Sequence, residues 1–438
     1  MKKTLSLTTA FCLLIASASV AQAQSAGRTL ARIFWQDAAT QTIHWSDLKK
    51  KGDEYALEKQ DLDNHPETDA DRHMLVQMQA IDELIVAGVR DDDDGNFNSG
   101  WVAIHSGVEK ESHGDHFHWH FDDTPRVTKV VIDDKQGNPA HVYRYGNSWY
   151  LANDQKNGIT RISPKALRSN STPDQFFSAG GGHITLAVSD DNVAYSTWID
   201  REGDNKGRVD VVGLESGSPI EFSFHTPSGG LHGATYNSGK AFFAPSEGVC
   251  WVSTSETSDP KVHHIDLGDD ASGMPKRTGA FKNIGSQVVF VAGRGPDTEL
   301  CSIDADSAKP KCLKLALEIG EGNSATTPYV FRTRTGKSLA VMFEENMDAD
   351  SEKMHVIDLD GNRDGDFSDA KLIHSMSVGK SQIQGHSGHH EICNLGGRLL
   401  LISSPGDGTI AVVSTRDWEE KAKIQVGGTP TRMLGIGG

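Results

Sequence analysis

Cysteine is scarce in this sequence, with five residues among 438, and Cys12 lies close to the N-terminus. No C-x-x-C pair is present, so thiolate metal ligands are not expected. Cys301 and Cys312 flank a turn-rich segment, as partners on adjacent hairpin strands would, and we predict a disulfide between them in an oxidising compartment. Cys250 and Cys393 are predicted to be buried thiols.

Long apolar runs are absent after residue 23, so no membrane-spanning helix is expected. Lys2 and Lys3 precede an apolar stretch from Leu5 to Val20, which is followed by an A-x-A site ending at Ala23. This pattern predicts a secretory signal peptide over residues 1–23. We therefore expect an exported, periplasmic and soluble protein formed by residues 24–438, most simply a monomer.

Familiar catalytic signatures are missing as well. The sequence contains no H-E-x-x-H, no G-x-S-x-G and no phosphate-binding glycine loop with a lysine, so we do not expect an enzyme. Acidic residues outnumber basic residues, and the net charge of −17 becomes −19 when the two lysines of the predicted leader are removed. Such an acidic surface repels phosphates, and nucleic acid partners are not expected.

Short apolar strands separated by Gly, Asp, Asn and Ser turns fill most of the chain from about residue 28. Strands at this spacing indicate an all-β sandwich, barrel or propeller. A motif with a glycine two places before a histidine recurs at Gly181/His183, Gly230/His232 and Gly388/His390, and a looser copy ends at His141. Related units lie roughly 40–50 residues apart, which is the period of a four-stranded propeller blade.

We therefore predict a single β-propeller of seven or eight blades, with eight favoured. The segment Thr429–Ile436 is expected to supply the strand that closes the ring against the first blade, which covers the sheet edges. Residues 74–88 fit either a short helix or two strands.

A histidine-rich loop, residues 109–124, is the most informative segment. His116, His118 and His120 alternate with Phe117 and Trp119, so an extended backbone would place the imidazoles on one face and the aromatic rings on the other. Further candidate ligands in the loop are His113 and Asp115. Three or four imidazoles suit Zn(II), with Cu(II) and Ni(II) as alternatives, whereas the competing interpretation is an exposed loop with adventitious affinity.

The histidines of the repeated motif form a second candidate set. Equivalent positions of successive blades reach the same height around the propeller axis, so these imidazoles would meet near one mouth of the channel. The set comprises His183, His232, His386, His389 and His390, with His141 as a weaker member. Each alone is more often a turn histidine, but together they predict a second metal site, which the 109–124 loop either joins or leaves separate.

The chain resembles the AztD family of periplasmic zinc metallochaperones in its predicted exported propeller, its H-x-x-H-x-H-x-H loop from His113 to His120, and its histidines at blade starts. The resemblance implies that zinc is carried and handed to the substrate-binding protein of a zinc ABC importer, an AztC-like partner. The alternatives are a zinc-dependent enzyme with a three-histidine site in the channel and a protein-binding scaffold.

Residues 360–371 carry a partial calcium-loop pattern. Asp360, Asn362, Asp364 and Ser368 occupy its first, third, fifth and ninth positions, but Lys371 stands where a bidentate glutamate is expected. A polar hairpin turn is the prediction here.

Overall fold

The last strand of the chain lies beside the first. In the computed structural model, which describes residues 27–91, 98–169, 174–215, 220–385 and 387–438, β36 (Pro430–Ile436) pairs antiparallel with β1 (Arg28–Asp37), and Phe34 is opposite Leu434. The predicted closure of the ring is thereby confirmed. The predicted leader lies outside the described residues.

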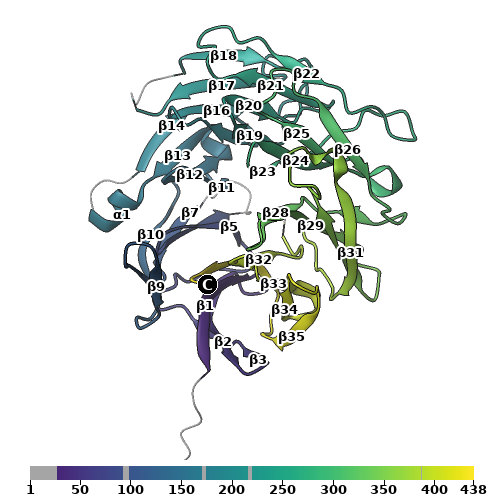
Figure 1. Cartoon of the computed structure of the whole chain (residues 1–438). Coiled ribbons are helices and arrows are strands. Elements are labelled where there is room, and N and C mark those ends of the chain that lie inside the picture. Colours follow the sequence, from purple (N-terminus) through teal and green to yellow (C-terminus); the bar gives the residue numbers. More distant parts are fainter. Residues whose placement is uncertain (1–26, 92–97, 170–173, 216–219, 386) are drawn as a thin grey trace, which may run out of the picture.

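Eight four- or five-stranded antiparallel sheets are arranged in a ring (Figure 1), so the prediction of an eight-bladed propeller is confirmed. The first blade contains β36, β1, β2 (Thr42–Lys51), β3 (Glu54–Ala56) and β4 (Gln60–Asp61). The second contains β5 (His73–Ile81), β6 (Leu84–Asp91), β7 (Ser99–His105) and β10 (Arg126–Asp133). Residues 74–88 therefore form two strands.

The next three blades follow one another along the chain. The third contains β11 (Pro139–Tyr145), β12 (Ser148–Asn153), β13 (Gly158–Ile162) and β14 (Asp174–Ser178). The fourth contains β15 (Leu186–Val188), β16 (Val193–Thr197), β17 (Arg208–Gly213) and β18 (Phe222–His225). The fifth contains β19 (Ala234–Asn237), β20 (Lys240–Phe243), β21 (Val249–Ser253) and β22 (His263–Ile265).

Three further blades complete the ring. The sixth contains β23 (Lys282–Ile284), β24 (Gln287–Ala292), β25 (Glu299–Asp304) and β26 (Cys312–Ala316). The seventh contains β27 (Ser324–Ala325), β28 (Tyr329–Arg332), β29 (Ser338–Glu345), β30 (Glu352–Asp358) and β31 (Lys371–Val378). The eighth contains β32 (Ile392–Leu395), β33 (Leu399–Ser404), β34 (Thr409–Ser414) and β35 (Glu420–Gln425).

Helical structure among the described residues is limited to short turns. These are α1 (Pro164–Ser169) and the 3-10 turns η1 (Asp154–Lys156), η2 (Gly295–Asp297), η3 (Phe367–Asp369) and η4 (Pro405–Asp407). A small hairpin of β8 (Glu109–Ser112) and β9 (Phe117–His120) stands apart from the eight blades. None of the described helices is long and apolar enough to cross a membrane.

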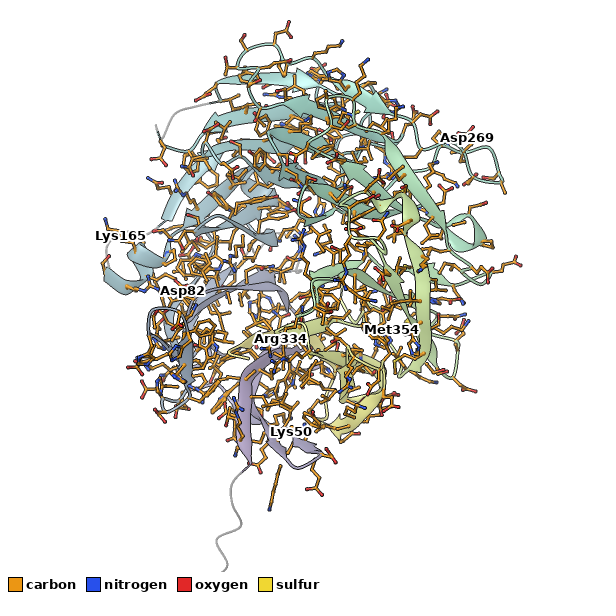
Figure 2. The ribbon with its side chains drawn as sticks, viewed as in Figure 1. Lys50, Asp82, Lys165, Asp269, Arg334 and Met354 are labelled. Atoms are coloured by element: carbon orange, nitrogen blue, oxygen red, sulfur yellow. The ribbon has the colours of Figure 1, made fainter. Side chains whose placement is uncertain are left out.

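The core lies between neighbouring sheets, where side chains fill the space (Figure 2). Trp35, Trp101 and Trp149 are fully buried there, each from a strand of a different blade. Burying one large apolar side chain stabilises the fold by about 1.5–3 kcal/mol, so each interface between blades contributes substantially. Rigid blades then hold the loops at the two ends of the channel.

The predicted disulfide is not present. Cys301 on β25 and Cys312 on β26 do lie on neighbouring antiparallel strands, as predicted, but Cys301 is opposite Lys314, and both cysteines are free thiols. Cys250 and Cys393 are buried free thiols, which confirms the prediction for them.

The innermost strands give the propeller two distinct faces. Each of them runs from one face, here called the strand-start face, to the other, the strand-end face. In the first blade, β36 begins with Pro430 opposite Asp37 and ends with Ile436 opposite Arg32. A seven-residue strand rises roughly 20 Å at about 3.3 Å per residue, and this length separates the two faces.

Candidate metal centres

The hairpin of residues 109–120, called here the histidine hairpin, has two chemically different faces. Its strands pair Glu111 with His118 and Lys110 with Trp119. The Lys110 ammonium lies 4.1 Å from the centre of the Phe117 ring, and Phe117 and Trp119 contact each other edge to face. Trp119 also packs against the core between the first two blades. The alternation read from the sequence is therefore correct, and one aromatic residue anchors the hairpin to the propeller.

Imidazoles gather on the other face of the histidine hairpin. The rings of His113, His116 and His118 lie with centroids 5.2–5.5 Å apart. A turn with a hydrogen bond from His113 N to His116 O, 2.8 Å long, brings the first two together. All three rings are exposed, so a metal ion or another protein can approach them from solvent.

Two carboxylates accompany these rings. One Glu111 oxygen, Oε2, lies 2.9 Å from His120 Nε2 and 3.4 Å from His113 Nε2. Asp115 Oδ1 lies 2.9 Å from His116 Nδ1. Carboxylates in this position orient imidazoles in metal sites and raise their basicity. Glu111 was not identified from the sequence, although it stands only two residues before the first histidine.

The channel histidines lie at the opposite, strand-start face. His183 precedes β15, and the turn that presents it contains Gly180 and Gly182, both with positive φ, a conformation that residues with a Cβ rarely adopt. The backbone N of Gly180 donates to the buried carboxylate of Asp210, 2.9 Å away, which fixes this turn. The glycine-rich motif therefore has a geometric cause.

His183 and His141 meet inside the channel. Their Nε2 atoms are 3.0 Å apart. His183 Nδ1 faces Asp154 Oδ2 at 3.0 Å, and His141 Nδ1 faces the Gln77 amide nitrogen at 3.3 Å. The Gln77 amide oxygen accepts from Val142 N, so its nitrogen is the donor toward His141. With this orientation of the Gln77 amide, His141 Nε2 is the donor in the contact with His183 Nε2.

His232 lies against the same pair. Its ring stacks on His183 with centroids 5.0 Å apart, and its Nδ1 donates to Gly279 O at 3.3 Å. Burial lowers the pKa of His232, and the neighbouring His183 lowers it further, so the neutral form that binds metal is favoured. His141 and His232 line a cavity of about 550 Å³, together with Tyr143, Lys282, His389, His390 and Arg432.

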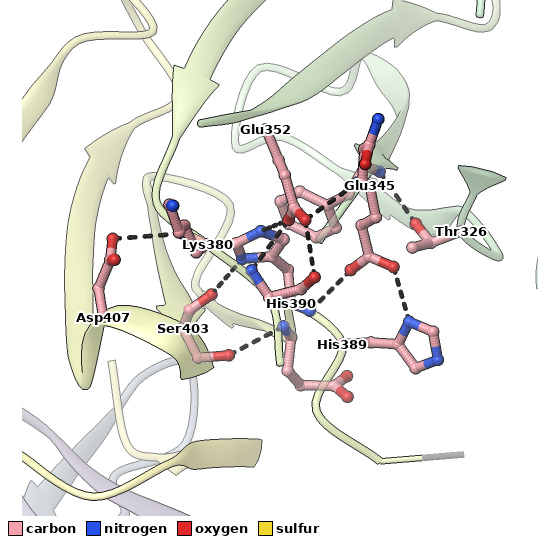
Figure 3. Close-up of polar contacts among 12 residues, drawn as sticks. Thr326, Glu345, Glu352, Lys380, His389, His390, Ser403 and Asp407 are labelled. Atoms are coloured by element: carbon pink, nitrogen blue, oxygen red, sulfur yellow. Dashed lines mark hydrogen bonds and ion pairs between the residues drawn. The ribbon is translucent and has the colours of Figure 1, made fainter. Parts of the chain in front are cut away.

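A third cluster joins the seventh and eighth blades (Figure 3). Glu345 ends β29, Glu352 begins β30, and His390 precedes β32; all three side chains are buried. One potential ligand atom from each lies within 4.8 Å of the others, which makes them a group of metal-ligand size. His390 Nε2 is 2.6 Å from Glu352 Oε2, and its Nδ1 donates to Ser403 O at 2.6 Å.

Hydrogen bonds already satisfy this third cluster. Glu345 accepts from His390 N at 2.9 Å and from His389 Nδ1 at 2.6 Å. Glu352 accepts from the hydroxyl and the backbone N of Ser381. Burial raises the pKa of Glu352, but the hydrogen bonds from His390 and Ser381 outweigh it, and the pKa lies below its usual value. These contacts occupy the polar groups of the cluster without a metal ion, and the same groups form a His–carboxylate ligand set.

The predicted residues thus separate into groups on opposite faces. The histidine hairpin follows β7, whose last residue His105 is opposite Leu84 at the strand-end face. About 20 Å of strand separates it from the channel histidines. Of the two alternatives left open by the sequence, the structure thus favours a 109–124 loop that is separate from the channel histidines. His390 shares the cavity with His232 but is directed at Glu352, and His386 lies outside the described residues.

Comparison with solved structures shows which proteins share this architecture. The structure of apo AztD from Citrobacter koseri matches with a TM-score of 0.63 at 14% identity, covering 93% of this chain and 98% of AztD. The chain has an AztD-like fold. A second crystal structure of C. koseri AztD gives 0.62 at 16% identity, with 94% and 99% covered. The dihydro-heme d1 dehydrogenase NirN gives 0.52 at 12% identity, with 93% and 75% covered.

These likenesses establish the fold alone, because both AztD and a dihydro-heme d1 dehydrogenase match the same architecture at low sequence identity. No protein-family model matches the chain, and neither does any curated protein. The function therefore has to be argued from the histidines and carboxylates described above.

Proposed function

We propose that this protein is an exported, periplasmic zinc metallochaperone that delivers Zn(II) to the substrate-binding protein of a zinc ABC importer. The observation that carries the proposal is the exposed trio of His113, His116 and His118 on the histidine hairpin. The AztD-like fold and the resemblance to AztD-type zinc metallochaperones support it.

Ligand exchange is the mechanism that such a hairpin favours. Three imidazoles hold zinc and leave its fourth position open, so an incoming ligand of the acceptor can bind before the first ligand leaves. The ion then passes between proteins without being released into water. Histidine ligands without thiolate keep the ion exchangeable. Trp119 anchors the hairpin, whereas the metal-binding face remains accessible to the acceptor.

A second zinc ion is proposed for the channel, with His141, His183 and His232 as ligands. Asp154 is proposed to orient His183 by accepting from its Nδ1. His389 and the Glu345–Glu352–His390 cluster are the alternative ligands at this face, because His389 and His390 line the same cavity. This ion would be less exchangeable than the one on the hairpin, since it is enclosed by the blades.

Replacing His113, His116 and His118 by alanine together tests the carrier site. We expect the variant to bind one zinc equivalent fewer than the parent protein, with an unchanged circular dichroism spectrum, because these rings are exposed and contribute little to the core. Chelator-stripped protein is titrated with Zn(II) in competition with a chromophoric chelator. The matched control is His225→Ala with His264→Ala, two exposed histidines of outer strands, which should leave the stoichiometry unchanged.

An equal zinc stoichiometry in the hairpin variant and the parent would contradict the carrier site. Transfer is tested separately. Zinc-loaded parent protein should transfer one zinc equivalent to a purified periplasmic zinc-binding protein faster than a chelator of equal affinity removes it. The hairpin variant should show no such faster transfer to the zinc-binding protein.

A zinc-dependent enzyme is the second candidate, and the channel supplies its argument. Lys282 and Arg432 line the same cavity as His232. Lys282 is solvent-exposed within the cavity, but desolvation by the surrounding protein lowers the pKa of its ammonium, which suits a proton-transfer group. We expect the zinc-loaded protein to hydrolyse model esters, phosphates and lactones no faster than the His183→Ala variant. Turnover that depends on both zinc and His183 would favour the enzyme instead.

A further inference from the structure

The loop that joins β30 to β31, residues 359–370, contains a buried carboxylate oxygen without a partner. Asp360 is 9% exposed, although its loop lies at the surface of the strand-end face. Its Oδ2 atom accepts from Gly365 N at 3.1 Å. Its Oδ1 atom is inaccessible to water and, within the described chain, has no hydrogen-bond donor. A buried carboxylate oxygen without a hydrogen-bond donor destabilises the folded protein unless a cation lies close to it.

Further oxygens of the loop have the spacing of a calcium-binding turn. Asn362 and Asp364 stand two and four residues after Asp360, and Gly365 takes a positive φ of 89° at the sixth position, where calcium loops turn sharply. The bond from Gly365 N to Asp360 leaves the other carboxylate oxygen as the one to face a cation.

Neighbouring blades hold this loop in place. Phe367 is buried in the core between the sixth and seventh blades, and the Gln287 amide nitrogen donates to Gly365 O at 3.0 Å. Asp369 returns to the start of the loop and accepts from Gly361 N and Asn362 N, which holds the two ends of the loop together. The basic side chains of the loop, Arg363 and Lys371, form no ion pair within the described residues.

We propose that residues 360–369 bind a calcium ion through side-chain oxygens of Asp360, Asn362 and Asp364 and a backbone carbonyl of Asp366. Hard oxygen donors without imidazole or thiolate favour Ca(II) over Zn(II). The ion neutralises Asp360 and fixes the loop between β30 and β31, whose Phe367 packs in the core between the sixth and seventh blades. This site is independent of the zinc chemistry proposed for the histidines and lies on a different blade from the histidine hairpin.

Calorimetric titration of chelator-treated full-length protein with CaCl2 tests the proposal. We expect one calcium ion per chain and a rise in Tm of about 3 °C at a calcium concentration roughly 100-fold above Kd. The variant D360N/D364N preserves the side-chain shapes and removes two charges, and it should lose both responses. The control D366N removes a charge from the same loop but keeps the carbonyl ligand, and its calcium response should resemble that of the parent.

Three results would overturn the calcium site. These are a parent protein whose Tm does not respond to calcium, a D360N/D364N variant with the same calcium response, and an equal Tm rise with magnesium at the same concentration. Zinc titration of D360N/D364N should match the parent, which keeps this test separate from that of the histidine hairpin.

Discussion

Replacing Glu352 by alanine should lower the free energy of unfolding of the metal-free protein by about 3–5 kcal/mol, because it leaves a buried partner without its counter-charge. Glu352 and His390 are both buried, and their side chains are 2.6 Å apart. The variant also removes the acceptor for Ser381 and the backbone N of Asn346. Urea unfolding in the presence of chelator measures the effect.

Two comparison variants separate the causes. Glu352→Gln keeps the shape and some hydrogen bonds but removes the charge. Its free energy of unfolding should therefore lie between those of the parent and Glu352→Ala. Glu321→Ala removes an exposed carboxylate and should change the free energy of unfolding by less than about 0.5 kcal/mol. A Glu352→Ala variant as stable as Glu321→Ala would contradict the structural role of the ion pair.

The same ion pair predicts a pH dependence. The pKa of Glu352 is lower in the folded protein than its usual value of 4.5. Its contribution to stability is therefore complete above pH 4.5 and is lost as the pH falls through the folded pKa. The part of the stability difference between the parent and Glu352→Ala that comes from this lowered pKa should accordingly shrink as the pH falls below about 4.5.

The propeller was predictable because its signal is local and repeated. Strand, turn and a glycine before a histidine recur at a blade's spacing, and each glycine reports a backbone turn such as that at Gly180. The two faces of the histidine hairpin were predictable for the same reason, since alternation along one strand fixes which side chains share a face.

Residues that complete the channel sites were not predictable, because their partners are distant in sequence. Glu352 lies 38 residues before His390, and Asp154 lies 29 residues before His183. Nothing near these carboxylates marks them as partners of histidine. The separation of the histidine hairpin from the channel was not predictable from the sequence either, because it depends on the direction in which β7 crosses its blade. The calcium-loop pattern was visible, but the unpartnered oxygen of Asp360 appears only in three dimensions.

The two proposed zinc sites lie on opposite faces of the propeller, the hairpin site on the strand-end face and the channel site on the strand-start face. A zinc ion on the histidine hairpin cannot share ligands with the channel, so occupancy of one site need not change the ligands of the other. Loss of the hairpin imidazoles should therefore leave the channel site filled. The acceptor protein is expected to approach the strand-end face, where the hairpin is exposed.

Removing residues 429–438 should abolish the folded monomer. The deletion takes away β36, the innermost strand of the first blade, with the buried side chains of Met433 and Ile436 and the packing of Leu434. Each buried side chain contributes about 1.5–3 kcal/mol, and the paired edge of β1 is lost as well, so the total is comparable with the 5–15 kcal/mol typical of a whole domain. Exposed β1 would then pair with other chains.

A circular permutant provides the matched control for this deletion. Placing residues 429–438 before residue 27 with a short linker restores β36 beside β1, because Ile436 is opposite Arg32 and both chain ends lie at the same face. We expect size-exclusion chromatography to give a monomer for the permutant and aggregates for the truncated chain. A truncated chain that is monomeric, with the parent's midpoint of urea unfolding, would mean that the first blade is stable without its inner strand and that ring closure adds little to the fold.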